Sequence, residues 1–247
     1  IDLEAGRKFW SFRPIANPQP PQVADKRWAT SDIDRFILAK LEAKKLHPVA
    51  DADRATWLRR VTFDLIGLPP SPAEIDAFLA DKSPNAYAAV VDRRLASPQF
   101  GERWGRHWLD VARFAESSGG GRSMVFKEAW RYRDYVFDSF NADKPFDRFI
   151  REQLAADQLH LPANSPDLAA LGLLTLGRMF DNNRHDVIDD QIDVIGRGFL
   201  GLSLGCARCH DHKHDPVPTA DYYSLYGVFA SGVEPYDRPR IGPVVKA

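Results

Sequence analysis

The sequence contains only two cysteines among its 247 residues, Cys206 and Cys209. A disulfide framework that ties distant parts of the fold together is therefore excluded. No apolar run approaches the length of a membrane-spanning helix, so we expect no transmembrane segment. The formal net charge is only −1, which gives no overall field to attract nucleic acid or an anionic membrane. The opening Ile1-Asp2-Leu3-Glu4 does not resemble an export signal, and we expect the chain to be a mature or excised piece.

Regular alternation of apolar and polar residues is also missing, so β-strands are expected to be absent or minor. Apolar residues recur instead at helical spacing, and the contents of 44% hydrophobic and 27% charged residues are typical of a globular protein. The sequence therefore predicts a mostly α fold, a multi-helix domain of about eight to ten helices. These helices are expected over residues 31–41, 57–65, 72–79, 86–96, 101–116, 128–140, 145–154, 168–176, 188–202 and 220–230.

Several helix ends carry local signals. Ser31 or Thr30 is expected to cap the first helix, and Gly67 to end the second. Ser71-Pro72-Ala73-Glu74 combines an N-cap, a proline at the first helical position and an early acid. One regular apolar stripe predicts a long amphipathic helix that leads directly into Gly205-Cys206. Its members are Ile188, Ile192, Ile195, Phe199 and Leu202.

The first thirty residues differ from the rest of the chain in composition. They hold three aromatic residues followed by four prolines: Phe9, Trp10, Phe12, Pro14, Pro18, Pro20 and Pro21. Since proline disfavours regular helix and strand, we expect residues 1–30 to form an extended arm whose aromatic side chains dock on the body of the protein.

The segment Cys206-Ala207-Arg208-Cys209-His210 has the spacing of a c-type haem attachment motif. Each thiol would add across one vinyl group of the haem, and the short turn between them would place the imidazole of His210 beneath the iron as its proximal ligand. Both cysteines would then be consumed by one covalently bound haem c. Because haem is attached outside the cytoplasm, this interpretation predicts a periplasmic or secreted protein.

Two other interpretations of the cysteines stay open. A zinc centre needs two ligands beyond the thiolates, and His212 and His214 are crowded too closely on one loop to match the usual spacing. A dithiol redox pair is typical of a strand-to-helix context, which this chain does not offer.

The second axial position of the iron could be closed by Met179 or His185, or left open for chemistry. Met179 has apolar neighbours and is otherwise typical of core filler. His185 is expected in the loop that precedes the 188–202 helix. His107, on the 101–116 helix beside Asp110, would be part of a structural network or an acid–base group near the iron.

Arg133 is expected to emerge from an apolar stripe of the 128–140 helix. A buried arginine needs an anionic partner. A haem propionate would suit the guanidinium, and a salt bridge to Asp110 or Glu116 is the alternative. Arg133 is therefore a candidate for cofactor binding and, together with His107, for catalysis.

Two polar clusters flank the motif. Residues 212–215 follow it and are interpreted as a turn toward the last helix, as a group that controls His210 through its ring N–H, or as a separate metal site. An acidic cluster precedes it and is expected to favour a helix N-terminus through the helix dipole. It consists of Asp181, Asp186, Asp189, Asp190 and Asp193.

Four long blocks of the chain resemble the planctomycete cytochrome C domain family, specifically the second cytochrome-type domain of large secreted planctomycete proteins. They read LIGLPPSPAEIDAFL, GERWGRHWLDVARFAES, AWRYRDYVFDSFNADKPFDRFIREQLAADQL and GLSLGCARCHDHKHDPVPTADYYSLYGVFA. The resemblance implies an exported bacterial protein with a small cytochrome module upstream and a partner domain downstream. The short Gly119-Gly120-Gly121 loop departs from relatives that carry a longer segment there, which leaves any site in that loop in doubt.

These observations predict that residues 31–247 form a single α-helical c-type haem domain, with an N-terminal helical subregion at 31–96 and a haem-bearing core at 97–231. The leading hypothesis is an oxidoreductase that exchanges electrons with another cytochrome module. The alternatives are a pure electron carrier with a closed sixth position and a non-catalytic scaffold in which haem is structural. A carbohydrate-derived substrate is suggested by the biological setting alone.

Overall fold

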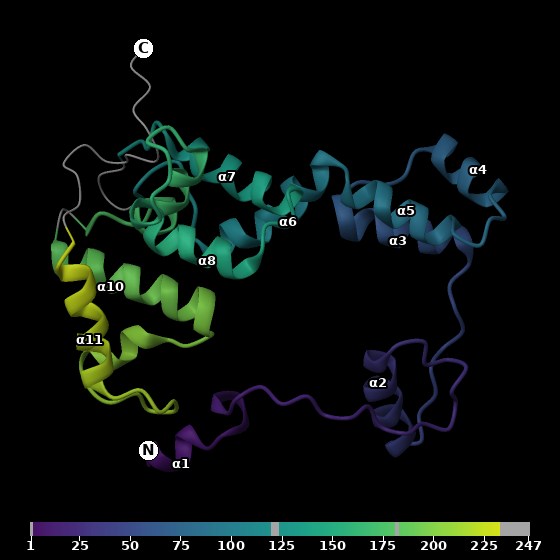
Figure 1. The fold of residues 1–247 in the computed structure, drawn as a ribbon, viewed down its shortest axis with the longest axis horizontal. Helices are drawn as coiled ribbons and strands as arrows, with labels where there is room; N and C mark the ends of the chain where they lie inside the picture. The colour runs from purple at the N-terminus through teal and green to yellow at the C-terminus, as the bar shows by residue number, and fades with distance from the viewer. Residues whose placement is uncertain (1, 120–123, 181–182, 233–247) are drawn as a thin grey trace.

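The computed structural model describes residues 2–119, 124–180 and 183–232. The mostly α prediction is confirmed: these ranges hold eleven α-helices, and their only β-pairing is the isolated bridge between Ser117 and Val125 (Figure 1). The helices are α1 (Leu3–Arg7), α2 (Asp32–Ala43), α3 (Arg54–Ile66), α4 (Pro72–Ala80), α5 (Ala86–Leu95), α6 (Pro98–Val111), α7 (Ala129–Asn141), α8 (Phe146–Ala155), α9 (Gly172–Thr175), α10 (Arg184–Ile195) and α11 (Thr219–Ala230). Gly120 and Gly121 of the glycine loop and Asp181 of the acidic cluster lie outside the described residues.

The predicted helix ends are confirmed where the signal is local. The Ser31 side chain accepts from the Asp34 N–H at 3.2 Å, and Asp34 accepts from the Ser31 N–H at 2.8 Å, which forms a complete capping box. Ser71 and Glu74 repeat this arrangement at α4. Gly67 ends α3 with φ +72°, a left-handed conformation that favours glycine.

The N-terminal third of the chain stands apart from the central core. Helices α3, α4 and α5 pack around Leu58, Phe78 and Val90, and α3 continues the contact to α6. Figure 1 shows α2 hanging from this group on a separate connection. Trp10 is 75% exposed and Phe9 57% exposed, so the expectation that the aromatic residues of the first segment dock on the body is wrong.

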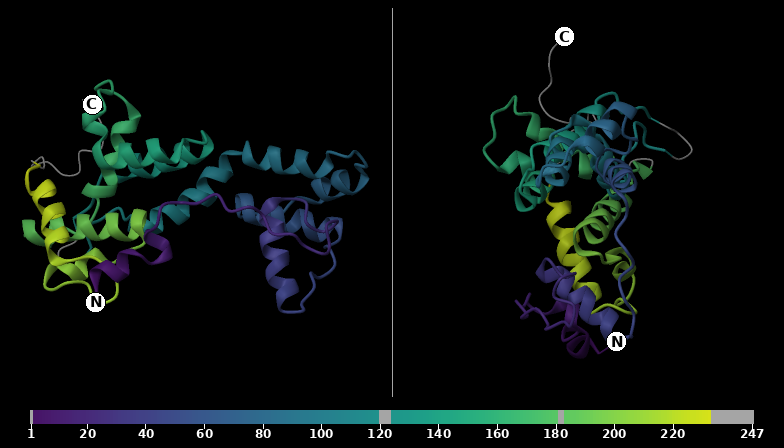
Figure 2. Two further views of the ribbon diagram at one scale, coloured as in Figure 1. Left: turned by 60° about the horizontal axis from the view of Figure 1, so that its bottom comes forward. Right: turned by 90° about the vertical axis from the view of Figure 1, so that its right-hand side faces the viewer.

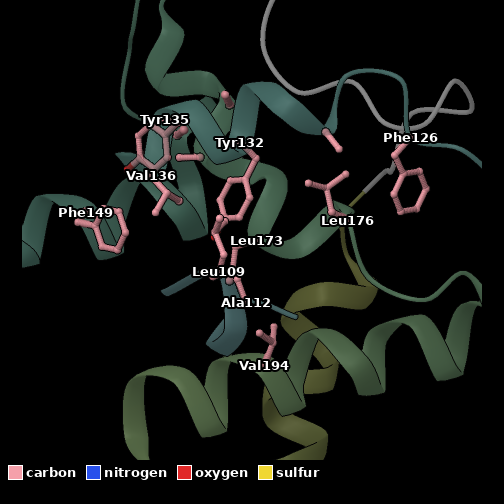
Figure 3. Close-up of a cluster of buried hydrophobic side chains, with 14 residues drawn as sticks. Leu109, Ala112, Phe126, Tyr132, Tyr135, Val136, Phe149, Leu173, Leu176 and Val194 are labelled. Atoms are coloured by element: carbon pink, nitrogen blue, oxygen red, sulfur yellow. The ribbon is translucent and has the colours of Figure 1, made fainter. Parts of the chain in front are cut away.

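The central core is built by α6, α7, α8 and α9 with one face of α10. Tyr132, Tyr135 and Phe149 fill its middle, and Figure 3 shows Val194 of α10 pointing toward Ala112 at the end of α6. Helices α6 and α7 approach so closely that a Cβ on Gly101 of α6 would lie only 2.4 Å from the Phe137 carbonyl oxygen of α7. Glycine is therefore needed at the contact, since any side chain there would push the helices apart.

A second, smaller core lies between α10, α11 and the segment that carries the two cysteines. Ile188 and Ile192 of α10 pack there with Tyr222 of α11, which is 1% exposed. Figure 1 and the left-hand view of Figure 2 show α11 beside α10 at the end of the molecule away from α3–α5. The cysteine motif is therefore held by a three-element unit of its own, joined to the central core through α10.

The helix predicted over residues 188–202 is confirmed as an α-helix up to Ile195, and beyond that residue its geometry differs. Helix α10 ends at Ile195 and is followed by a π-helical turn, Gly196–Leu200, which stops at Gly201 with φ +66°. The apolar stripe is also shared between two cores, since Ile188 and Ile192 pack in the second core while Ile195 packs in the central one. A tight return explains the ending, since the Leu202 N–H donates to the Gly196 carbonyl at 2.9 Å.

Candidate functional site

The motif lies on a short 3₁₀ helix, Leu204–Arg208, with Cys209 directly after it. In a 3₁₀ helix the side chains at positions i and i+3 eclipse each other. Leu204 and Ala207 form the inner pair and are 4% and 0% exposed, packed in the second core. Cys206 and Cys209 form the outer pair, and both are exposed free thiols. Burial of the inner pair therefore presents the two thiols on one outward face.

His210 is exposed beside the thiols, and its ring is held by one bond. Its Nδ1 lies 2.7 Å from the carbonyl oxygen of Asp211. A carbonyl can only accept, so Nδ1 carries the proton and Nε2 keeps its lone pair. This hydrogen bond selects the tautomer that a metal-ligating imidazole uses, with the partner being backbone rather than a side chain of residues 212–215.

The outer face of α10 supports the motif through charged and phenolic side chains. Arg208, between the two cysteines, bonds Asp186 at 3.0 Å and Asp189 at 3.4 Å. Tyr222 donates to Asp189 at 2.6 Å, and Tyr223 donates to the Arg208 carbonyl at 3.1 Å. Burial, together with the Asp189 carboxylate, raises the pKa of Tyr222. The acidic cluster thus makes tertiary contacts in addition to favouring a helix start.

Arg113 joins the motif-bearing unit to the central core. Its Nε lies 3.0 Å from both carboxylate oxygens of Asp190 on α10, and its Nη1 donates to the Leu173 carbonyl at 2.9 Å. Gly177 permits this pair, because a Cβ there would lie 2.5 Å from Arg113 Nη2. Arg113 itself adopts φ +51°, a strained conformation for a residue with a side chain.

The two candidates for the sixth iron position lie in different surroundings. Met179 is half-buried and packs against the central core. His185 lies in the first turn of α10 instead of the preceding loop, with its Nδ1 hydrogen-bonded to the Tyr226 hydroxyl and its ring stacked at 5.9 Å from that of Tyr226. Iron ligation by either residue stays a prediction.

His107 and Arg133 are not brought together with the motif by any described contact. His107 is on the exposed face of α6, where its ring lies 5.6 Å from that of Trp104, and Asp110 pairs with Arg106 instead. The expected burial of Arg133 is wrong, since its side chain is 37% exposed. It bonds its neighbour Asp134 at 2.9 Å and reaches Glu116 at 3.8 Å. The cause is the α7 stripe, which turns Tyr132 and Val136 inward and leaves position 133 at its edge.

A cavity of about 390 Å³ opens between α6, α7 and α8, with mainly aromatic walls. It is lined by Phe100, Trp108, Ser139, Phe140, Asp143, Lys144, Phe146 and Phe149. None of the site residues expected from sequence lines it. Trp108 connects it to the motif-bearing unit, because its ring lies 5.5 Å from that of Phe199 in the π-helical turn.

A zinc ion would need several donor side chains that converge on one position. In the described ranges, no group of three or more His, Cys, Asp or Glu side chains converges on a position for a metal ion. The zinc interpretation therefore gains no ligand set from the described part of the chain.

No helix among the described residues has both the length and the apolar character needed to cross a membrane.

Sequence reasoning missed three residues that hold the motif in place, Ser203, Arg208 and Tyr222, and it named Asp189 only as a member of the acidic cluster. Their partners lie 9 to 33 positions away in the chain, as with the Tyr222–Asp189 bond. Only the position of Arg208 between the two cysteines could have drawn attention to it.

The chain matches a family model described as PSCyt2, protein of unknown function (DUF1549). The match covers residues 32–234 and begins at the first residue of α2. No curated protein and no solved structure matches the chain.

Proposed function

This chain belongs to the PSCyt2 (DUF1549) family, whose name denotes a cytochrome-type domain, and on that premise we propose that it is a c-type haem domain that takes part in electron transfer. When bound, the haem supplies a one-electron iron couple. The protein contributes two thiols, one axial imidazole and a fixed setting for all three.

The observation that carries the proposal is the shared outward face of Cys206 and Cys209, with His210 next to it. Burial of Leu204 and Ala207 fixes the orientation of the short 3₁₀ helix, so the two thiols share one conformation and do not sample many loop conformations. The bond from His210 Nδ1 to the Asp211 carbonyl leaves Nε2 available as a ligand. This donor set suits one face of a c-type haem.

Attachment of haem by the two thiols needs no oxidant. Each thiol S–H adds across one vinyl C=C bond, so that a C–S bond forms and the hydrogen goes to the other vinyl carbon. Since Cys206 and Cys209 are unpaired and exposed, both thiols are accessible for this addition. Haem addition outside the cytoplasm makes the periplasm or the exterior the proposed location.

An exposed motif also favours electron exchange with a second protein module. Electron transfer needs the haem edge close to the surface, and residues 206, 209 and 210 are all exposed. We therefore propose an oxidoreductase role in which electrons pass to or from another cytochrome module. A carbohydrate-derived substrate and a downstream partner domain belong to the same proposal.

The first test is haem attachment. The chain is expressed in a host that attaches haem c, and the intact mass and the reduced absorption spectrum are measured. We expect one haem per chain with both thiols consumed. Cys206→Ala and Cys209→Ala should each leave one thioether, and the double variant none. Wild-type protein with two free thiols and no Soret band would refute the proposal.

The second test concerns the sixth position. Carbon monoxide or peroxide is added to the reduced and oxidised haem protein, and the change in spectrum is recorded. A response is expected for an oxidoreductase with an open or displaceable ligand. An unresponsive low-spin iron would favour a pure electron carrier, and Met179→Ala and His185→Ala would then identify the residue that closes the site.

A further inference from the structure

His212 is the buried histidine of the loop that follows the motif, residues 210–218. Its residue exposure is 7%, whereas His210 and His214 are both exposed. Burial of a polar ring is costly unless its nitrogens find partners. The partners of His212 therefore indicate what the ring is doing there.

Both ring nitrogens of His212 are engaged. Nδ1 accepts from the backbone N–H of His214 at 3.2 Å and of Asp215 at 2.8 Å. Because two backbone N–H groups donate to Nδ1, it carries no proton even though the Asp215 carboxylate oxygen lies 3.3 Å away, and the ring proton lies on Nε2. Nε2 lies 3.2 Å from the Ser203 hydroxyl oxygen and donates to it. His212 has no lone pair left for iron, so it is excluded as an axial ligand in this conformation.

These bonds join the two ends of the attachment motif. Ser203 immediately precedes the 3₁₀ helix with the cysteines, and the Cys206 N–H donates back to its carbonyl at 3.2 Å. Asp215 lies on the other side, where the loop turns toward α11. The His212 N–H adds a further tie by donating to the Val217 carbonyl at 2.9 Å. One imidazole thus bridges the segments before and after the motif.

We propose that His212 is a positioning residue that holds the attachment motif in its outward-facing geometry before haem binds. The step concerning haem rests on the proposed function, whereas the step concerning the loop does not. Two vinyl additions to one rigid macrocycle require both thiols and the axial imidazole in register, so a preset geometry favours the second addition once the first has occurred. Such a residue does not contact the haem itself, and it acts by holding the reacting side chains in place through packing and hydrogen bonds.

The experiment separates the two bonds of the ring. His212→Phe keeps the ring volume and removes both sets of bonds. His212→Asn keeps an acceptor for the two loop N–H groups but is too short to reach Ser203. Ser203→Ala removes that partner alone. His214→Phe is the matched control, because the His214 ring is exposed and phenylalanine keeps both the backbone N–H and an aromatic ring 6.4 Å from the ring of His212.

The first readout uses the haem-free protein. Amide hydrogen exchange of Asp215 is expected to be up to about tenfold faster in His212→Phe, which corresponds to about 1.4 kcal/mol at this site. Exchange should stay near the wild-type rate in His214→Phe and His212→Asn. Unchanged exchange at Asp215 in His212→Phe would overturn the proposal.

The second readout counts thioethers by mass spectrometry in folded, haem-loaded chains. A misplaced motif is expected to yield chains with one thioether, whereas a general loss of stability would only lower the amount of folded protein. We expect the singly attached fraction to rise several-fold in His212→Phe and to a smaller extent in Ser203→Ala. A wild-type proportion of doubly attached haem in His212→Phe would overturn the positioning role.

The two failures can be told apart. If wild-type chain and His214→Phe take up no haem at all, the proposed function and the haem step of this inference are both overturned. Faster exchange at Asp215 in His212→Phe would in that case still support the role of His212 in holding the loop.

Discussion

The tie between Arg113 and Asp190 is predicted to carry a large share of the attachment between the motif-bearing unit and the central core. We consider the replacement Asp190→Ala. The guanidinium of Arg113 would keep its bonds to the Ala112 and Leu173 carbonyls at 3.1 and 2.9 Å but lose its anionic partner. Removing one partner of a buried pair costs about 3 to 5 kcal/mol.

The side chains of this pair are not fully buried, being 27% exposed at Arg113 and 18% at Asp190. Water can therefore solvate part of the orphaned guanidinium, and we expect the free energy of unfolding to fall by about 2 to 3 kcal/mol. For a chain of this size, that loss lowers the melting temperature by roughly 5 to 10 °C. Thermal and urea unfolding followed by circular dichroism measures both quantities.

The matched control is Asp147→Ala, which removes the partner of Arg151 on the surface of α8. Those side chains are 70% and 65% exposed, so the expected loss is below about 1 kcal/mol. Equal losses for Asp190→Ala and Asp147→Ala would refute the reasoning. A double-mutant cycle with Gly177→Ala sharpens the test. A Cβ at position 177 would lie against Asp190 and Arg113, and the cost of Gly177→Ala should be smaller once Asp190 has been removed.

Three further predictions concern stability elsewhere in the fold. Gly101→Ala should lower the free energy of unfolding by more than about 2 kcal/mol in urea titrations, because its Cβ would lie 2.4 Å from the Phe137 carbonyl oxygen; a loss no larger than that of Gly227→Ala, where a Cβ meets nothing within 4 Å, would contradict the close packing of α6 on α7. The hydrogen bond from the Ser71 backbone N–H, and after it the bond from Arg94, lowers the pKa of Glu74. The ionised Glu74 carboxylate therefore stabilises the fold above pH 4.5, and this stabilisation is lost as the pH falls through the lowered pKa. Unfolding curves of Glu74→Gln between pH 7 and 3 should depend less on pH than those of the wild type, and parallel curves would count against the α4 capping box. The raised pKa of Tyr222 means that the folded state favours the neutral phenol, so the free energy of unfolding should fall as the pH rises above 10. Tyr222→Phe loses the bond to Asp189, so its free energy of unfolding should be lower by about 1 to 2 kcal/mol at pH 7 and should fall less steeply above pH 10. An equally steep fall in Tyr222→Phe would exclude Tyr222 as the cause of the alkaline loss of stability.

How far the sequence predicts the molecule depends on how local each interaction is. Ser31, Gly67 and Ser71 were identified correctly because a helix cap satisfies backbone groups within three or four residues. Of the two helices flanking the glycine loop, the second was predicted to within one residue at each end, whereas the first ends at Val111 and not at residue 116. The 188–202 helix departs from the prediction at Gly196, where a π-helical turn begins and a Cβ would lie 2.7 Å from the Leu202 carbonyl oxygen.

The candidate site divides along the same line. The motif itself was legible, because the spacing of Cys206, Cys209 and His210 is a property of the chain alone. The sequence also predicted that Arg133 would be buried, whereas the actual edge of the α7 stripe depends on which helices pack there. Partners such as Arg113 and Asp190 are 77 residues apart, and no local pattern links them.

The sequence by itself thus determined the helical class, the capped helix ends and the Cys-x-x-Cys-His spacing, since each of these depends on neighbours within about one helical turn. Only the tertiary structure decided which way the motif faces. Leu204 and Ala207 turn inward because Ile188, Ile192 and Tyr222 provide an apolar surface for them, and the thiols are exposed as a result. The tertiary structure also decided that His212 is buried with its Nε2 bonded to Ser203, while His210 is exposed and bonded only through Nδ1. The sequence places these two histidines two residues apart and gives no sign of this difference.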